Sequence, residues 1–269
     1  MDRSNPALVT HWEGGLTSAR NMELLGEEPL SIRVEGKPYA VVMRTPGEEA
    51  AHAAGFCLGE GIIDSAADCS SIGLCEGETA NAVTVTLTPA RRAAIGDILD
   101  RRSYLSQTSC GICGKELLED LAQRTLPLPP GAAIDIGTIL AGMEAMAAQQ
   151  PLRRATRAAH AAALCDSNGT PFAVAEDIGR HNALDKAVGK ALLEGSLAQA
   201  SLAVLSSRVS YEMVQKSARA GVAVVFSVSR PTRLAVELAT RLDMALACLA
   251  PGNGVYLFCG QGRLRLTPS

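Results

Sequence analysis

The sequence predicts an α/β protein in two parts, a smaller α/β domain followed by a larger layered α/β domain. Strand-like and helix-like patterns alternate after residue 136, which is typical of a sheet covered by helices. A shorter set of such patterns occupies residues 29–102. The segment LPLPPG, residues 126–131, separates the two sets, because three prolines in six residues favour an extended path.

The first elements lie before this proline-rich segment. Residues 1–28 show no hydrophobic period, so we expect a flexible arm there. The small domain, residues 29–125, opens with LSIRVEG and YAVVMR, which predict a hairpin. Thr45 and Glu48 predict a capping box for a helix that runs to about Gly59. A half-buried strand and a second helix are expected over residues 83–88 and 89–102.

The larger domain is expected over residues 136–269, after a linker over residues 126–135. Its first helix spans about residues 136–150 and stops at Pro151. Further helices are expected between the strands, and the one after His181 carries a single apolar stripe. The strand patterns are AAHAAALCD, FAVAED, LAVLSS, VAVVFSV, MALACLA and GVYLFCG.

Composition narrows the function classes. The net charge of −3 gives no general attraction to nucleic acid or to an anionic membrane. The first twenty residues lack the apolar core of a secretory signal, and no run of eighteen apolar residues exists. Eight cysteines are too few in 269 residues for a disulfide scaffold. We therefore expect a soluble cytoplasmic protein with reduced thiols and with no nucleic-acid or membrane partner.

One close thiol pair, Cys110 and Cys113, lies in the glycine-containing stretch TSCGICGK. Three chemistries use this spacing, namely zinc binding, dithiol redox work and sulfur transfer. A helix N-terminus and Lys115 nearby would favour the thiolate, which is the nucleophilic form. From the residues alone, two other interpretations of this cysteine pair stay open, namely half of a metal-binding knuckle and a buried structural pair. The single cysteines in apolar segments are expected to be inert core residues: Cys57, Cys165, Cys248 and Cys259.

The stretch EDIGRHNALDKAVGK, residues 176–190, concentrates charged residues at a helix start. One interpretation is a metal site of Asp177, His181 and Asp185. A second is a capped helix with an ordinary ion pair, and a third is anion recognition by Arg180 and Lys186. His181 and His160 are either acid/base groups or structural histidines.

Two further stretches also place charged and hydroxyl residues at the start of a helix. SSRVSYEMVQK, residues 206–216, and SRPTRLAVE, residues 229–237, each follow a strand and open a helix. Hydroxyls and arginines at strand-to-helix turns can hold phosphate, and ligands of open α/β sheets gather at these ends. Three such turns in one domain predict a phosphorylated ligand.

Together the motifs resemble the FdhD family of formate dehydrogenase accessory sulfurtransferases. They occur in the family's order and cover nearly the whole chain. The matching stretches are GEGII (59–63), SCGICG (109–114), HAAAL (160–164), EDIGRHNALDK (176–186), SSRVSYEMVQK (206–216) and PTRLAVELA (231–239).

This resemblance implies a sulfur carrier protein, a sulfurtransferase required for formate dehydrogenase activity. It would accept persulfide sulfur from a cysteine desulfurase and pass it to the molybdenum cofactor. That cofactor, bis-molybdopterin guanine dinucleotide, would be a bound substrate before its insertion into formate dehydrogenase, and no permanent cofactor or metal is expected. The resemblance also implies a cytidine-deaminase-like layered α/β/α domain at the C-terminal end and a homodimer.

The resemblance also assigns site residues. Cys110 matches the persulfide carrier and Cys113 matches its partner. The guanine dinucleotide would be contacted by the turn after the penultimate strand, LAPGNG, and by the charged strand-to-helix turns. The expected cofactor-binding residues are Leu249, Ala250, Pro251, Gly252, Asn253, Gly254, Arg180, His181, Ser207, Arg208 and Arg230.

Two departures from the family pattern stand out. The loop over residues 249–254 has no basic residue, whereas family members carry one. Thr156 and Arg157 stand where a Thr-Gly pair is usual before His160.

The catalytic residues of the zinc deaminases are absent from the motif at His160, because two alanines follow this histidine where deaminases have x-Glu. Two other functions stay open, a non-catalytic chaperone that binds and delivers the molybdenum cofactor and a zinc-dependent hydrolase.

Overall fold

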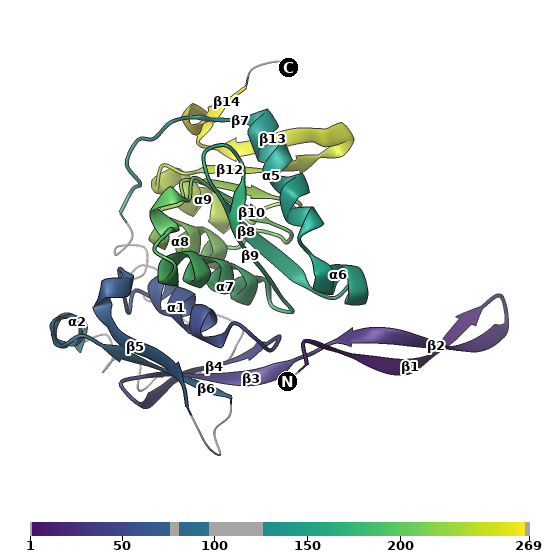
Figure 1. The fold of residues 1–269 in the computed structure, drawn as a ribbon. Helices are drawn as coiled ribbons and strands as arrows, with labels where there is room; N and C mark the ends of the chain where they lie inside the picture. Colours follow the sequence, from purple (N-terminus) through teal and green to yellow (C-terminus); the bar gives the residue numbers. More distant parts are fainter. Residues whose placement is uncertain (1, 76–80, 97–125, 267–269) are drawn as a thin grey trace.

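The structure is a computed structural model that describes residues 2–75, 81–96 and 126–266. A four-stranded sheet lies in the N-terminal half and a six-stranded sheet in the C-terminal half (Figure 1). This mixed α/β architecture confirms the predicted fold class, whereas likeness to cytidine deaminases stays a prediction. Within the described ranges, no helix is both long enough and apolar enough to cross a membrane.

The six-stranded sheet has the order β13-β12-β11-β10-β8-β9. Strands β10, β11 and β12 run parallel, whereas β8 is antiparallel to both of its neighbours and β13 is antiparallel to β12. These strands are the expected ones, because each is an apolar run bounded by polar turns. Their bounds are β8 (His160–Cys165), β9 (Pro171–Asp177), β10 (Leu202–Leu205), β11 (Val224–Ser227), β12 (Ala245–Ala250) and β13 (Gly254–Cys259).

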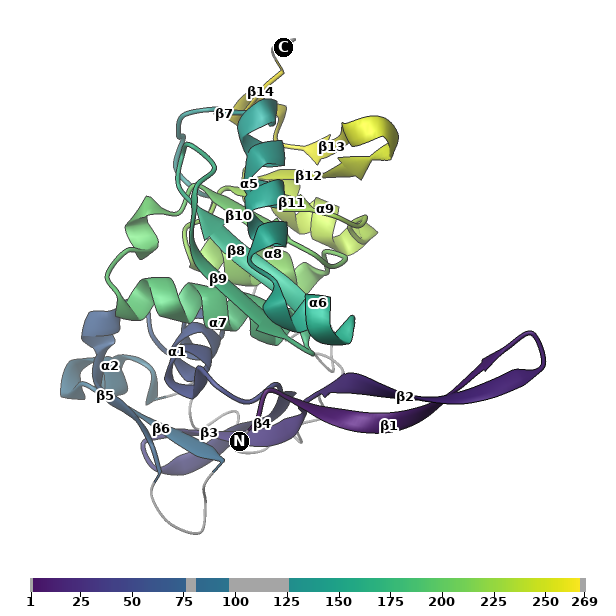
Figure 2. The same ribbon diagram turned by 45° about the vertical axis from the view of Figure 1, so that its right-hand side comes forward.

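Helices cover both faces of this sheet (Figures 1 and 2). On one face, Met146 packs in a core cluster with Phe226, and on the other face Leu184 packs in a cluster with Leu246. The first face is covered by α5 (Ile136–Ala148), which leads into α6 (Pro151–Thr156). The second face is covered by α7 (Arg180–Leu193), α8 (Tyr211–Arg219) and α9 (Arg233–Arg241). A short parallel pair, β7 (Ile134–Asp135) and β14 (Leu264–Arg265), lies beside them.

The N-terminal sheet has the order β4-β3-β6-β5, and helix α1 (Glu49–Gly59) packs against it. The alternation of apolar and polar residues buries one face only, with Ile32 and Val83 inside. The strands are β3 (Glu28–Val34), β4 (Lys37–Arg44), β5 (Cys69–Leu74) and β6 (Ala82–Leu87). The last helix of this half, α2 (Pro89–Ala94), lies just before the end of the described range at residue 96.

The two halves meet where α1 crosses α7 at very short range. A Cβ atom built on Gly55 would lie 1.9 Å from the carbonyl oxygen of Asp185. A Cβ atom on Gly189 would lie 1.7 Å from the carbonyl oxygen of Ala51. Only glycine permits this approach, because any other side chain would collide with backbone. One core cluster therefore continues from the N-terminal sheet through α1 and α7 to the C-terminal sheet.

A long hairpin precedes the N-terminal sheet, formed by β1 (Ser4–Glu13) and β2 (Leu16–Leu25). The prediction of a flexible arm over residues 1–28 is therefore wrong about the local structure there. The reason is that apolar residues point to both faces of the hairpin, which hides the one-sided pattern of an ordinary surface strand. At its base, the amide of Gly26 donates to the carbonyl of Arg3 at 2.8 Å.

The start of α1 also differs from the prediction. The N-cap residue is Glu48, which has a left-handed φ of 64° and makes no side-chain capping bond. The hydroxyl of Thr45 instead accepts a hydrogen bond from the amide of Ile178 at 3.1 Å. The predicted capping box is therefore wrong, because Thr45 is used to join the two halves.

The single cysteines behave largely as expected. Cys57, Cys165 and Cys248 are buried, whereas Cys259 is only partly buried. Burial raises the pKa of Cys57 and raises that of Cys165 to about 12. These thiols therefore stay protonated near neutral pH and are poor nucleophiles.

Candidate functional site

All the charged turns singled out from the sequence lie at one edge of the six-stranded sheet. The parallel strands β10, β11 and β12 end there, and so does β9. Strand β8 begins at the same edge, since His160 pairs with Asp177. The turn after β10 contacts the turn after β11 through a bridge between Val209 and Pro231. Parallel strands bring their carboxyl ends together, so separate motifs form one continuous edge.

His160 is surrounded by arginines at this edge. Burial lowers the pKa of His160, and Arg180, Arg153 and Arg208 lower it further because their positive charges oppose protonation. Within the described ranges, none of the three arginines forms an ion pair with a carboxylate. The buried Nε atom of Arg180 and the buried Nδ1 atom of His160 have no hydrogen-bond partner among the described residues. An anionic ligand would accept a hydrogen bond from the Nε–H group of Arg180 and so satisfy it.

His181 lies beside this arginine cluster at the N-terminus of α7. Its Nε2 atom is 3.1 Å from the hydroxyl of Ser210 and 3.5 Å from a carboxylate oxygen of Glu212. Burial lowers the pKa of His181, and although Glu212 opposes this shift, the pKa falls to about 4. The imidazole is therefore neutral at pH 7 and can exchange a proton with a ligand or with Ser210.

The loop after β12 borders the same edge. A 3₁₀ turn spans Pro251–Asn253, and Gly252 adopts a left-handed φ of 69° that favours glycine. Pro251 and Gly252 are exposed, and Leu249 and Ala250 are partly buried before the strand resumes at Gly254. The guanidinium of Arg230 lies 5.5 Å from the ring centre of Tyr256 on β13. This exposed cation–π pair supplies a positive charge beside a loop that has none of its own.

Two predicted residues do not offer free side chains to a ligand. Ser207 is buried, and its hydroxyl donates to the carbonyl of Arg208 at 3.0 Å. Lys186 is fully buried and donates to the carbonyl of Thr45 at 2.7 Å. Anion recognition by Lys186 is therefore wrong, whereas Arg180 and Arg208 remain available at the edge.

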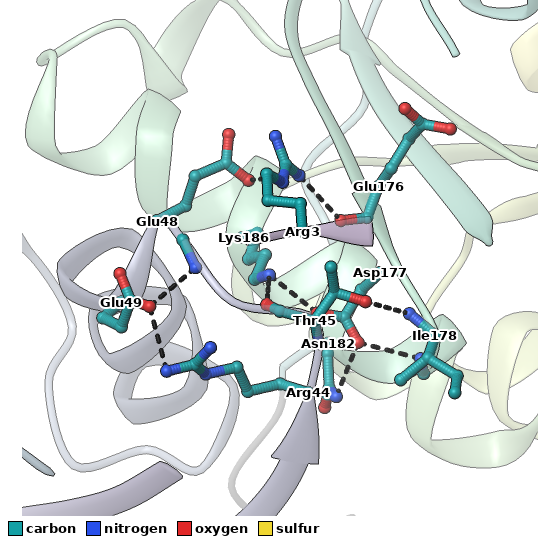
Figure 3. Close-up of polar contacts among 12 residues, drawn as sticks. Arg3, Arg44, Thr45, Glu48, Glu49, Glu176, Asp177, Ile178, Asn182 and Lys186 are labelled. Atoms are coloured by element: carbon teal, nitrogen blue, oxygen red, sulfur yellow. Dashed lines mark hydrogen bonds and ion pairs between the residues drawn. The ribbon is translucent and has the colours of Figure 1, made fainter. Parts of the chain in front are cut away.

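Lys186 instead belongs to a buried polar network between the two halves (Figure 3). Its Nζ atom is 2.7 Å from the carboxylate of Asp177, and both side chains are fully buried. Asp177 also accepts from the amide of Thr45 at 3.0 Å and from the side chain of Asn182 at 2.9 Å. Glu48 pairs with Lys190 and lies 3.8 Å from Arg3. Every charge in this network has a partner.

A second buried pair involves Asp185, the residue just before Lys186 on α7. Lys216 on α8 donates to both carboxylate oxygens of Asp185, at 2.8 and 2.9 Å. Burial alone would lower the pKa of Lys216, but Asp185, Glu212 and Glu60 more than offset this and raise it. Asp177 and Asp185, the two acids considered as metal ligands together with His181, are thus each paired with a different lysine. Among the described residues, no group of three or more His, Cys, Asp or Glu side chains is placed to hold a metal ion.

Sequence reasoning missed three residues that the structure brings to this region. Glu212 and Lys216 lie within the motif SSRVSYEMVQK and are four residues apart, so their shared helix face was readable. Arg153 gave no such signal, because it belongs to the short helix α6 and reaches His160 only through the fold. The thiol pair Cys110 and Cys113 lies outside the described residues, so its assignment stays a prediction.

The edge of this layered sheet carries a neutral histidine together with Arg180 and Arg208, which have no carboxylate partner among the described residues. These features define an α/β protein with a candidate site for an anionic ligand. Comparison with protein families gives a narrower class. The FdhD/NarQ family matches residues 25–265, and the chain belongs to that family.

Individual relatives agree over nearly the full length. A protein of Anaeromyxobacter dehalogenans named sulfur carrier protein FdhD is 40% identical over 254 residues, which cover 90% of this chain and 88% of the relative. A Streptomyces avermitilis protein of the same name is 37% identical over 262 residues, covering 94% and 92%. The crystal structure of a candidate formate dehydrogenase accessory protein from Desulfotalea psychrophila has the same fold. Its TM-score is 0.78 at 23% identity, and the match covers 98% of this chain and 100% of that one.

Proposed function

We propose that this chain is a sulfur carrier that supports a formate dehydrogenase. Its donor would be a cysteine desulfurase, and its acceptor the molybdenum cofactor in its bis-molybdopterin guanine dinucleotide form, before insertion into formate dehydrogenase. The observation that carries this proposal is the 40% identity, over 90% of the chain, to a protein named sulfur carrier. The close thiol pair and the arginine-lined sheet edge supply the two kinds of group that such a function needs.

The first step loads sulfur onto Cys110. Its thiolate attacks the outer sulfur of the donor's cysteine persulfide, a new S–S bond forms, and the donor cysteine leaves as a thiolate. No electrons are gained or lost in this exchange, and the carrier then holds the outer sulfur as a persulfide.

The second step releases that sulfur toward molybdenum. The thiolate of Cys113 attacks the inner sulfur, which is the Cys110 sulfur, so a disulfide forms and the outer sulfur leaves as sulfide. The sulfide then replaces an oxygen ligand of molybdenum, and that oxygen leaves as water after taking up two protons. A low-molecular-weight thiol or a dithiol protein reduces the disulfide and completes the cycle.

The sheet edge would hold the cofactor during transfer. A guanine dinucleotide carries a pyrophosphate, and Arg153, Arg180 and Arg208 lie near His160 without carboxylate partners in the part of the chain that the structure describes. Charge-assisted hydrogen bonds of this type are about twice as strong as neutral ones. The neutral imidazole of His181 would take up or deliver protons beside the bound ligand.

Mass spectrometry tests the carrier role directly. After incubation of the full chain with a cysteine desulfurase and cysteine, the Cys110 peptide is expected to gain the mass of one sulfur atom. Cys110→Ser should abolish the gain, whereas Cys113→Ser should keep it and block sulfide release. Cys75→Ser is the control, because Cys75 is a partly exposed thiol outside the Cys110–Cys113 motif.

A delivery chaperone that only binds the cofactor is the competing function. It predicts no mass gain on any cysteine, together with binding of guanine nucleotides that Cys110→Ser leaves unchanged. That pair of results would contradict sulfur transfer and leave the binding role of the arginine cluster intact.

A further inference from the structure

The sheet edge that carries the candidate site changes character along its length. At the end formed by β9, β8 and β10, three arginines lie near His160. At the other end, the loop over residues 249–254 has no basic residue. The strand that follows this loop, β13, instead carries two exposed aromatic side chains, Tyr256 and Phe258. The edge therefore has a cationic end and an aromatic end.

Strand register places Tyr256 level with the ends of the neighbouring strands. Leu205 and Ser227, the last residues of β10 and β11, pair with each other, and Ser227 also pairs with Cys248 on β12. Cys248 in turn pairs with Tyr256. Arg230 follows Ser227 by three residues, so its turn starts from the same row. Tyr256 thus lies at the edge where the ligand-binding turns of such sheets begin.

The side chain of Tyr256 points to the same side of the sheet as these turns. On β13, Val255 and Leu257 pack against the core cluster on the α5 face, and alternate residues of a strand point to opposite faces. Tyr256 therefore points to the face covered by α7, α8 and α9, the helices into which the turns lead. On that face the guanidinium of Arg230 lies 5.5 Å from the ring centre of Tyr256.

The exposure of this ring is unusual in a chain of which only 3% is aromatic. Of the three tyrosines that the structure describes, Tyr39 is partly buried and Tyr211 is buried. Tyr256 is 43% exposed, so part of its ring is open to a ligand. An exposed aromatic ring next to an arginine is the combination of side chains on which nucleotide bases stack.

We propose that Tyr256 stacks with the base of a bound guanine nucleotide, whose pyrophosphate lies toward Arg208. Guanine as the base rests on the proposed function, and the stacking contact adds the direction in which the ligand lies. A nucleotide has an anionic end and a flat, uncharged end, which match the cationic and aromatic ends of the sheet edge. In the reverse direction, the pyrophosphate would lie away from the three arginines and the base would lie among them.

The spacing of the strands fits this arrangement. Neighbouring strands lie about 4.8 Å apart, so three spacings separate Tyr256 on β13 from the end of β10 by roughly 14 Å. Arg208 lies in the turn that follows β10 and is exposed. A nucleoside diphosphate has a ribose between its base and its phosphates, which gives it a comparable length. The base can therefore reach Tyr256 while the pyrophosphate contacts the turn of Arg208.

Isothermal titration calorimetry of the full chain with two probes, guanosine diphosphate and inorganic pyrophosphate, tests this contact. In Tyr256→Ala, affinity for guanosine diphosphate should fall about tenfold or more, because the stacking contact is lost. Affinity for pyrophosphate should stay within about twofold of the parent, because pyrophosphate has no base to stack. Arg208→Ala should weaken the binding of both probes.

Two variants of β13 serve as controls. Tyr256→Phe keeps an aromatic ring and should bind guanosine diphosphate within about threefold of the parent. Phe258→Ala removes an exposed ring from the same face of the same strand, farther from the edge, and should leave both affinities unchanged. Circular dichroism establishes that all the variants fold.

Three outcomes would overturn the stacking contact. One is an equal loss of affinity for both probes in Tyr256→Ala, which would mean that the ring supports the site without touching the base. Another is parent-like binding of guanosine diphosphate by Tyr256→Ala, which would place the base elsewhere. The third is a parent that binds neither probe, and only this result would also count against cofactor binding in the proposed function. The persulfide test above uses no nucleotide, so failure of sulfur loading is measured separately.

Discussion

Helix α7 carries two kinds of charged site that differ in how their charges are satisfied. In its middle, Lys186 is fully buried and pairs at 2.7 Å with Asp177, the equally buried last residue of β9. At its N-terminus, Arg180 and His181 lie with Arg208 at a strand edge, and neither of these two arginines has a carboxylate partner among the described residues. The middle joins the two halves of the molecule, and the end faces outward.

This difference separates structural charges from functional ones. A buried charge that is fully paired contributes mainly to the fold, and breaking the pair is costly. Arginines left unpaired around a desolvated histidine repel one another, so they cost stability unless a ligand neutralises them. We therefore expect substitutions in the middle of α7 to reduce stability and substitutions at its end to reduce binding.

The largest effect is expected at the helix crossing. In Gly189→Ala the new methyl group would lie 1.7 Å from the carbonyl oxygen of Ala51, so α1 and α7 must separate. We expect a loss of about 4 kcal/mol or more in unfolding free energy, measured by denaturant titration. Gly73→Ala is the control, because nothing lies within 4 Å of its Cβ position. Equal stability of the two variants would mean that the crossing is looser than described.

The buried ion pair should give the next largest effect. Lys186→Met leaves the carboxylate of Asp177 buried with only neutral donors, and we expect a loss of about 3 kcal/mol in unfolding free energy. Lys190→Met removes a partly exposed lysine from the same helix and should cost at most about 1 kcal/mol. Thermal melts at pH 7 compare the two, and a larger loss in Lys190→Met would contradict the contrast.

Substitutions at the strand edge should lower ligand affinity and leave stability nearly unchanged. Arg180→Ala or Arg208→Ala is expected to weaken binding of guanosine diphosphate by roughly 10- to 100-fold, as one charge-assisted contact is lost. Isothermal titration calorimetry measures the affinity, and unfolding free energies should stay within about 0.5 kcal/mol of the parent. The exposed pair formed by Arg233 and Glu237 on α9 supplies the control variant, Arg233→Ala. A loss of stability without a loss of affinity would reverse the assignment.

The contact between the two halves of the molecule also predicts that the unfolding free energy depends on pH. His52 on α1 is fully buried, and burial lowers its pKa well below 6.5, with Lys186 and Lys216 adding to the effect. The unfolded chain therefore binds a proton on this residue below pH 6.5 that the folded chain does not. The contribution of His52 to the unfolding free energy is therefore fully present above pH 6.5. Below pH 6.5 it should fall by about 1.4 kcal/mol per pH unit.

Comparison of unfolding free energies at pH 7.5 and pH 5.5 checks this dependence. His52→Gln should flatten the slope by the contribution of one histidine, whereas His11→Gln on the hairpin should leave it unchanged. An equal slope in the parent and in His52→Gln would contradict the buried position of His52, because Asp185, whose pKa burial raises to about 7, and the other histidines contribute equally to both slopes.

The smallest effect is expected at Arg157, next to the arginine cluster. Its φ of 58° lies in the left-handed region, where any residue other than glycine is strained. Arg157→Gly should relieve the strain and gain about 0.5 kcal/mol after the entropy of glycine is counted. Arg157→Ala removes the same charge without relief and should gain nothing. Thermal melts distinguish the two.

Much of the fold was accessible from local pattern. Apolar runs bounded by polar turns gave the six strands of the C-terminal sheet, because burial on both faces leaves a continuous apolar signature. The hairpin of β1 and β2 was missed, because its apolar residues point both ways. Thr45 was misassigned as a helix cap, because its real partner, Ile178, lies 133 residues away in the chain.

For the candidate site, the sequence by itself determined the chemistry of the motifs, since a thiol pair and arginine-bearing turns keep their reactivity in any fold. Tertiary structure alone decided which of those charged side chains are buried in ion pairs and which stay at the surface for a ligand. Lys186 and Arg180 are six residues apart and looked equivalent. Only the crossing of α1 over α7 buries Lys186 against Asp177, while the end of strand β9 leaves Arg180 at the edge. Burial and pairing depend on contacts between distant segments, and no local pattern encodes them.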